Sequence, residues 1–167
     1  DIVHFDAHLD YIDHIEGVRH TNGSPFRRAA ELPFVRHMSH LGIRHLRSHP
    51  PDFAAATERG NLIVTRQQIR EEGPEGVLAR LPKMDKIYFS IDIDGLDPSI
   101  APGTTSPSPD GVLYHEFRAL MQGVTKLGQV VGFDFVELNP MLDPSGRTTL
   151  LAAHAILEVL DAIFDQR

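Results

Sequence analysis

The sequence predicts an α/β fold with three layers, α/β/α, built around a mainly parallel sheet. Short β-branched or aromatic runs alternate with helical patterns along the 167 residues. This order is typical of parallel strands that are joined by helical crossovers. A composition of 41% hydrophobic and 23% charged residues suits a globular protein. No repeat or linker divides the chain, so we expect residues 1–167 to belong to one domain.

The first half of the chain already shows this alternation. The predicted elements are a strand over 1–5, a polar loop to about residue 24, a helix over 25–42 interrupted near Pro33, a strand over 43–47, a helix over 51–60 and a strand over 61–64. Gly42 and Gly60 each end a helical pattern, which is a common position for glycine.

The second half contains the strongest strand pattern, "KIYFSIDID" over 86–94. The other predicted elements are one or two helical pieces over 67–81 broken at Gly73-Pro74, a loop over 95–111, a helix over 114–128, a strand over 129–138 and a long helix over 148–164. A loop of about 17 residues is long for a compact domain and is usually functional.

Charge and composition exclude several classes of protein. The net charge is −7 and no Lys/Arg cluster is longer than "FRR", so we expect no nucleic-acid and no membrane partner. The absence of Cys excludes disulfides, thiolate zinc ligands and a Cys nucleophile. No apolar run approaches the ~18 residues of a membrane span, and no signal peptide is visible. We therefore expect a cytoplasmic enzyme.

The segment "HFDAHLD" places Asp6, His8 and Asp10 at alternate positions directly after the first predicted strand. In an extended backbone, alternate side chains point to the same side. Two carboxylates and an imidazole would therefore converge on one small volume. Crowded carboxylates repel each other unless a cation lies between them, so this spacing predicts a metal site.

Two further strands end in acids. Asp92 and Asp94 follow "KIYFSI", and Glu137 ends "VVGFDFVE". Sites in open parallel sheets form beyond the carboxyl ends of the strands, so all of these acids should meet at one edge. Such ligands suit Mn²⁺, and also Fe²⁺, Co²⁺ or Zn²⁺. Four aspartates carry too much charge for one divalent ion, which favours two ions that activate a water for hydrolysis.

Other polar residues in the chain have simpler expected roles. Asp97, before Pro98, is expected to form a turn. His4 is expected to be structural, and His37 and His40 are expected on the surface of the helix predicted over 25–42.

These motifs resemble the signature blocks of the ureohydrolases, a family of arginases, agmatinases, guanidino-acid hydrolases and formimidoylglutamases. The similarity rests on "FDAHLD", "SIDIDGLDPSIAPGT" and "FDFVELNP" and extends from Asp1 to about Ile163. "GSPFRRA" and "VGFDFVELNP" look more like the agmatinase branch. The resemblance implies an arginase-like α/β/α fold, two Mn²⁺ per complete active site, and hydrolysis of agmatine or a guanidino acid to urea. It also implies a homo-oligomer, a trimer or hexamer.

The resemblance also implies a role for each metal ligand. Asp6 and Asp92 would bridge the two ions. Asp10 would bind the first ion and hydrogen-bond the bridging hydroxide, while His8 and Asp94 would bind the second ion.

On the substrate side, the resemblance assigns the guanidinium partner to Glu137. Ser106 stands where the family usually has Thr near the substrate, in "GTTSP" rather than "GTGTP". Asn22 holds the position of an agmatinase His that helps to protonate the leaving amine. His20, two residues earlier, would face the same side in an extended loop, so we expect it to substitute as the proton donor.

One block of the family is absent from these residues. Its first metal ligand is a His in a G-G-D-H-like block upstream of "DAHLD", and this sequence contains no such block. We expect an N-terminal part of the domain to be missing here, because the chain starts with a strand at Asp1. We also expect these 167 residues to bind the second ion well and the first poorly.

Two alternative functions fit the same residues. A formimidoylglutamase-like hydrolase of a formimino group is favoured by Asn22, because that branch often lacks the agmatinase His. A non-catalytic ureohydrolase-like subunit is the other alternative. A two-metal phosphoesterase is disfavoured, because Glu137 would repel phosphate.

Overall fold

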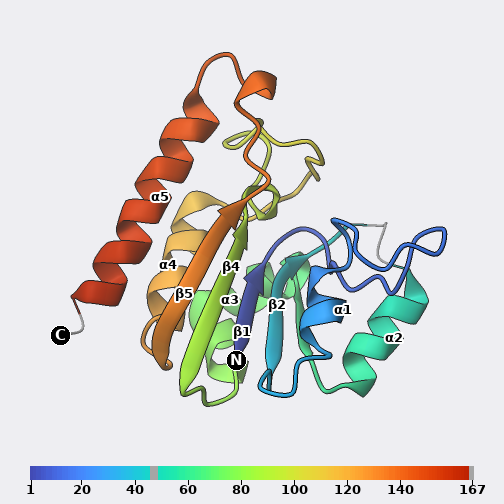
Figure 1. Ribbon diagram of the computed structural model, residues 1–167. Helices are drawn as coiled ribbons and strands as arrows, with labels where there is room; N and C mark the ends of the chain where they lie inside the picture. The colour runs from blue at the N-terminus through green and yellow to red at the C-terminus, as the bar shows by residue number, and fades with distance from the viewer. Residues whose placement is uncertain (46–48, 166–167) are drawn as a thin grey trace.

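The sheet of the computed structural model is entirely parallel, and its strands follow the order β3-β2-β1-β4-β5. The structure describes residues 1–45 and 49–165. The strands are β1 (Ile2–Phe5), β2 (Met38–Ile43), β3 (Leu62–Thr65), β4 (Lys86–Asp92) and β5 (Gln129–Val136). The first strand of the chain is thus the central strand of the sheet (Figure 1).

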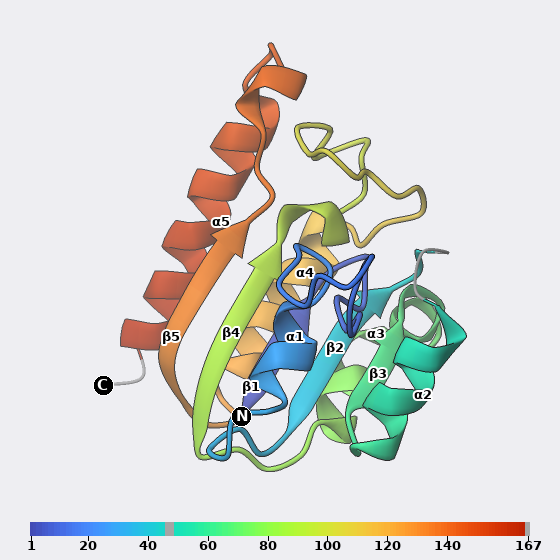
Figure 2. The same ribbon diagram turned by 45° about the vertical axis from the view of Figure 1, so that its right-hand side comes forward.

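Helices cover both faces of the sheet, which confirms the predicted three-layer α/β/α fold (Figures 1 and 2). The helices are α1 (Pro25–Ala29), α2 (Pro50–Glu58), α3 (Arg66–Arg80), α4 (Tyr114–Val124) and α5 (Arg147–Phe164), with short 3₁₀ turns η1 (Ile93–Gly95) and η2 (Pro140–Leu142). Helices α3, α4 and α5 pack on the larger apolar core, whereas α1 and α2 pack on a smaller core over the other face. Among the described helices, none has the length and apolar character needed to cross a bilayer.

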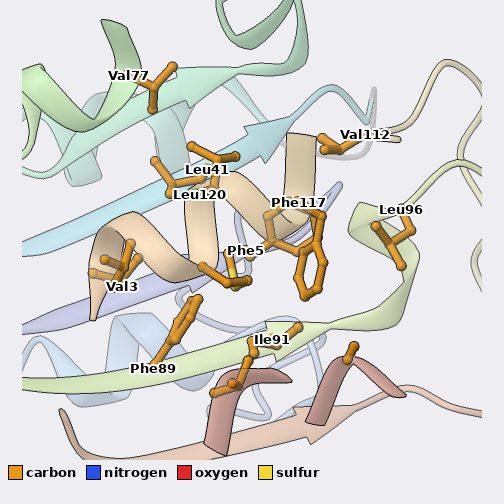
Figure 3. Packing of buried hydrophobic residues seen from close by; sticks show 14 of the residues in the cluster. Val3, Phe5, Leu41, Val77, Phe89, Ile91, Leu96, Val112, Phe117 and Leu120 are labelled. Atoms are coloured by element: carbon orange, nitrogen blue, oxygen red, sulfur yellow. The ribbon is translucent and has the colours of Figure 1, made fainter. Parts of the chain in front are cut away.

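The larger core fixes the ends of β1 and β4 beside each other. Phe5 stacks edge-on against Phe117 of α4, with 5.0 Å between the ring centroids (Figure 3). A Cβ atom added to Gly95 would lie 2.4 Å from the Phe5 ring. The turn that follows β4 therefore requires glycine at this position, because any side chain would clash with Phe5.

The pairing register brings three strand ends together. Phe5 of β1 lies opposite Ile91 of β4, and Asp92 of β4 lies opposite Val136 of β5. Residues directly after β1, β4 and β5 consequently share one edge of the sheet, as the sequence predicts.

The prediction of a helix over 25–42 is wrong beyond its first turn. Only Pro25–Ala29 is helical, and Met38–Ile43 forms β2 instead of the strand predicted over 43–47. Residues 46 and 47 of that prediction lie outside the described part of the chain. Every residue of β2 is buried, polar Ser39 and His40 included. A strand that is covered on both faces lacks the polar–apolar alternation that identifies strands.

Most other predicted elements are confirmed with small shifts in their bounds. The break predicted at Gly73-Pro74 is a kink within α3, where Gly73 has a φ of 69°. The strand predicted over 86–94 ends at Asp92, because residues 93–95 turn into η1.

Candidate metal centre

The acids predicted from the strand ends lie close together at the carboxyl edge of the sheet. Asp6 follows β1, Asp92 ends β4 and Asp94 lies in η1. Ligand atoms of Asp6, His8 and Asp94 all lie within 4.8 Å of one another. His8 Nδ1 is 3.2 Å from Asp6 Oδ1 and 3.1 Å from Asp94 Oδ2. Two carboxylates and one imidazole therefore form a compact group.

Backbone N–H groups hold these carboxylates in place. The N–H of His8 donates to Asp6 Oδ1 over 2.6 Å, and the N–H of Asp94 donates to Asp92 Oδ1 over 2.9 Å. The N–H of Ala7 donates to Asp94 Oδ1 over 3.2 Å, which joins the turn after β1 to the turn after β4. The alternate spacing of the acids thus allows each turn to be stabilised by its own carboxylate.

The centre has more negative charge than a buried site tolerates. Burial, reinforced by neighbouring carboxylates, raises the pKa of Asp6, Asp10 and Asp92. Burial alone would lower the pKa of His8, but its hydrogen bonds to Asp6 and Asp94 raise it to about 10. Crowded acids of this kind bind protons, unless a bound metal cation neutralises their charge instead.

The residues present fit a divalent cation. Asp6, Asp92 and Asp94 are 1%, 4% and 2% exposed, so water cannot compensate their charges. His8 Nε2 is buried and has no hydrogen-bond partner within the described part of the chain. Carboxylate oxygens with one imidazole nitrogen are a donor set suited to Mn²⁺ and neighbouring divalent metals.

A cavity of about 170 Å³ opens beside this group. It collects most of the predicted site residues in its wall, namely His8, Asp10, Asn22, Asp92, Asp94, Ser106 and Glu137. A second cavity of about 360 Å³ shares Asp10, Asn22, Asp92 and Glu137 and reaches Asp6. Predicted metal ligands and predicted substrate-side residues therefore line these two neighbouring cavities together.

His20 is the predicted site residue that lies apart. It is exposed on the loop after β1 and lines neither cavity. Asn22, on the same loop, is exposed at the cavity wall.

Several contacts of the site were not predicted from the sequence. Thr105 donates a 2.8 Å hydrogen bond to Glu137 Oε2, and Asp52 lines the first cavity. His40, expected on a helix surface, is 0% exposed in β2 and faces the ring of His4. Thr105 could have been suspected from its place next to Ser106, but the direction of a loop side chain is not readable from a pattern.

Asp97 confirms its predicted turn. Its carboxylate accepts hydrogen bonds from the N–H groups of Ser99 and Gly111 over 2.9 and 2.7 Å. These contacts close the 95–111 loop, whose residue Ser106 lines the first cavity.

Comparison with protein-family models places the chain in a family. The model described as the arginase family matches residues 1–161. The chain belongs to the arginase family. Guanidinopropionase of Pseudomonas aeruginosa is 37% identical to this arginase-family chain over 165 residues, 95% of this chain and 52% of the relative. Formimidoylglutamase of Corynebacterium efficiens is 35% identical over 166 residues, 96% of this chain and 52% of the relative.

A solved structure gives the same family fold. Proclavaminate amidino hydrolase from Streptomyces clavuligerus superposes with a TM-score of 0.88 at 33% identity, over 97% of this chain and 55% of that chain. This arginase-family chain spans about half the length of the curated relatives it matches.

Proposed function

We propose that this chain forms the larger part of the active site of a manganese-dependent hydrolase that releases urea from a guanidino compound. The observation that carries the proposal is the compact ligand group of Asp6, His8 and Asp94, within 4.8 Å. It is supported by the similarity to guanidinopropionase, whose name describes action on a guanidino acid.

The residues that would hold the metal are the four aspartates and one histidine at the ends of β1 and β4. Asp6 and Asp92 would each bind both ions, Asp10 would complete one ion's ligands, and His8 and Asp94 the other's. When bound, such a pair of ions supplies the Lewis acidity that activates a water as nucleophile.

The substrate side would use residues of the first cavity. Glu137 would accept hydrogen bonds from the guanidinium in a charge-assisted contact. Asn22 and Ser106 would contact the substrate beside it, and Asp10 would orient the attacking water by a hydrogen bond. Proton transfer to the leaving amine is assigned to His20, which the loop would have to bring toward the cavity.

A urea-release assay tests this function. The protein expressed from its complete gene would be loaded with Mn²⁺ and offered agmatine, guanidinobutyrate, guanidinopropionate and arginine. We expect the unaltered protein to release urea from at least one of these compounds. The Asp94→Ala variant should lose both the bound metal and the release of urea. Asp161→Asn, at an exposed position of α5, is the matched control and should retain both.

Hydrolysis of a formimino group is the second candidate function. Formimidoylglutamase of Corynebacterium efficiens is 35% identical, and Asn22 stands where the agmatinase branch has His. Formamide release from formiminoglutamate, with no urea from any guanidino compound, would support this candidate against the first. Release of neither product by the metal-loaded protein would refute both and favour a non-catalytic subunit.

A further inference from the structure

A row of buried polar side chains leads from Asp6 through the layer between the sheet and α1. His4 Nε2 lies 2.8 Å from Asp6 Oδ2, and His4 Nδ1 lies 3.0 Å from Nδ1 of His40. His40 Nε2 lies 3.1 Å from Asn61 Nδ2. At the far end, Arg59 Nη1 donates a 3.0 Å hydrogen bond to Asn61 Oδ1. All four ring nitrogens of the two histidines are therefore within hydrogen-bond distance of a partner.

The strand register builds this row. His4 of β1 is the direct neighbour of His40 in β2, and His40 pairs with Ile63 of β3, two residues after Asn61. His4, His40 and Asn61 are 2%, 0% and 8% exposed. The ring of Phe26 in α1 covers that of His4, with 3.9 Å between the centroids, so the imidazole plane is fixed by packing.

The direction of the hydrogen bonds follows from the Arg59 end. A guanidinium only donates, so the oxygen of the Asn61 amide faces Arg59 and its NH₂ faces His40. His40 Nε2 must then accept, which leaves the His40 proton on Nδ1. That proton is donated to His4 Nδ1, so His4 has its own proton on Nε2.

The opposite end gives the same direction independently. With a metal ion bound, Asp6 is an ionised carboxylate that only accepts hydrogen bonds, so His4 Nε2 must donate to it. His4 Nδ1 is then the acceptor for His40. Burial holds the pKa of His40 well below its ordinary value, in keeping with a neutral ring that has one donor and one acceptor.

We propose that Arg59, Asn61, His40 and His4 form a one-way hydrogen-bond chain that positions the Asp6 carboxylate for metal binding. These four residues and the hydrogen bonds between them form the relay. It rests on the proposed function, which makes Asp6 a metal ligand. The relay holds Asp6 Oδ2 from behind, while Oδ1 faces His8 and Asp94. Hydrogen bonds behind a ligand fix its orientation and commonly change metal affinity 10- to 100-fold.

If packing alone mattered, apolar side chains could fill the same space without any need for hydrogen-bond partners. Three polar side chains in an apolar layer lose their hydration, and each must find partners to compensate. Here the partners form one continuous series of hydrogen bonds, which ends at Asp6 of the candidate metal centre. The relay residues are thus positioning residues, because they act on the centre only through Asp6.

The first test reads the proton positions in the histidine rings. Long-range ¹H–¹⁵N spectra of the ¹⁵N-histidine-labelled protein, loaded with diamagnetic Zn²⁺, should show a His4 ring protonated at Nε2 and a His40 ring protonated at Nδ1. In Asn61→Asp the new carboxylate can only accept, so the His40 proton should move to Nε2. A His40 ring protonated at Nε2 in the unaltered protein would overturn the relay.

The second test reads metal affinity. The Kd for Mn²⁺, measured by calorimetry on the protein from its complete gene, should rise at least tenfold in Asn61→Asp and in His4→Leu. His4→Gln should restore most of the affinity, because its amide N–H can still donate to Asp6. Ser39→Ala, a buried change in β2 beside His40, is the matched control and should leave Kd unchanged.

The outcomes separate the relay from the proposed function. If the unaltered protein binds no divalent ion, the proposed function fails and the relay with it. If it binds Mn²⁺ and Asn61→Asp binds equally tightly, the relay alone is refuted. Since Asn61 does not touch Asp6, a folded Asn61→Asp variant, checked by its circular dichroism, keeps the test valid even if His4→Leu does not fold.

Discussion

Asp10 and Glu137 both line the first cavity in a backbone conformation that L residues seldom adopt, with φ of 48° and 60°. Such a conformation costs about 1–3 kcal/mol per residue and persists only where its surroundings enforce it. Both residues line the cavity beside the candidate metal centre. Two of the four described non-glycine residues with positive φ, the others being Glu16 and Asp110, are thus acids to which the proposed function assigns a role.

Glu137→Gln tests the guanidinium contact. Loss of one charge-assisted contact is worth about 1.5–3 kcal/mol or somewhat more in a dry site, so kcat/KM should fall about 10- to 1,000-fold. Metal content by atomic spectroscopy should stay unchanged, because Glu137 is not a proposed ligand. Wild-type kcat/KM in this variant would contradict the role.

Thr105→Gly tests the contact behind Glu137. The Thr105 hydroxyl holds one oxygen of that carboxylate over 2.8 Å, so its loss should raise KM about 3- to 10-fold with little effect on kcat. Thr105→Ser keeps the hydroxyl and is the control. Equal KM values for the Gly and Ser variants would show that the hydroxyl has no influence on substrate binding.

The proton-donor role of His20 stays a prediction, because the exposed loop places it outside both cavities. If the loop brings it to the substrate, His20→Ala should lower kcat about 100-fold or more and change the shape of the pH–rate profile. Identical pH–rate profiles for the two proteins would exclude the role and favour the formimino substrate.

At the scale of elements, the start of α5 depends on Asp143. Its carboxylate accepts hydrogen bonds from the N–H and hydroxyl of Thr148 over 2.8 and 2.7 Å, and Thr148 Oγ1 accepts from the Gly103 N–H over 2.9 Å. Bonds to Ser145 and Thr148 hold the pKa of Asp143 below its ordinary value. The turn before α5 thereby anchors the loop that contains Thr105 and Ser106.

The lowered pKa of Asp143 predicts a pH effect with a definite sign. A carboxyl whose pKa is lower in the folded state stabilises the protein above its ordinary pKa and loses this contribution as the pH falls through the folded value. Asp143→Asn should therefore lower the urea midpoint at pH 7 and flatten its decline below about pH 4. Parallel midpoint curves for the two proteins from pH 7 to 3 would contradict this.

The strand β2 shows where sequence reasoning fails. The positions of the acids in the candidate metal centre could be predicted, because alternation along a strand and the common edge of a parallel sheet are geometric rules. The relay could not be predicted, because "VRHMSHLG" has apolar residues at helical spacing, and this pattern predicts that His37 and His40 lie on a helix surface. Only the register of β1 with β2 brings His40 to His4.

At the scale of the whole molecule, the candidate metal centre joins parts of the chain that are distant in sequence. Asp6 and His8 follow the central strand β1, whereas Asp92 and Asp94 belong to the end of β4. The layers and the shared strand edge follow from the alternation of elements, but the cavity depends on the long loops after β1 and β4, whose paths no periodic pattern encodes. The fold was therefore more predictable than the substrate-facing wall.

The central place of β1 also has a kinetic consequence. Three crossovers separate β1 from its partner β4 along the chain, so the β1–β4 pairing closes a long stretch of chain and should form late in folding. An ion held by Asp6, His8 and Asp94 would join the ends of β1 and β4.

At 100 times its Kd, this ion would add about 2.7 kcal/mol to the free energy of unfolding. A contact that forms late in folding mainly slows unfolding and has little effect on the folding rate. We therefore expect Mn²⁺ to slow unfolding in urea about 100-fold and to leave the refolding rate almost unchanged. Stopped-flow circular dichroism measures both rates, and the protein in EDTA is the metal-free control. If Mn²⁺ instead accelerates refolding about 100-fold, β1 and β4 pair before the rate-limiting step of folding.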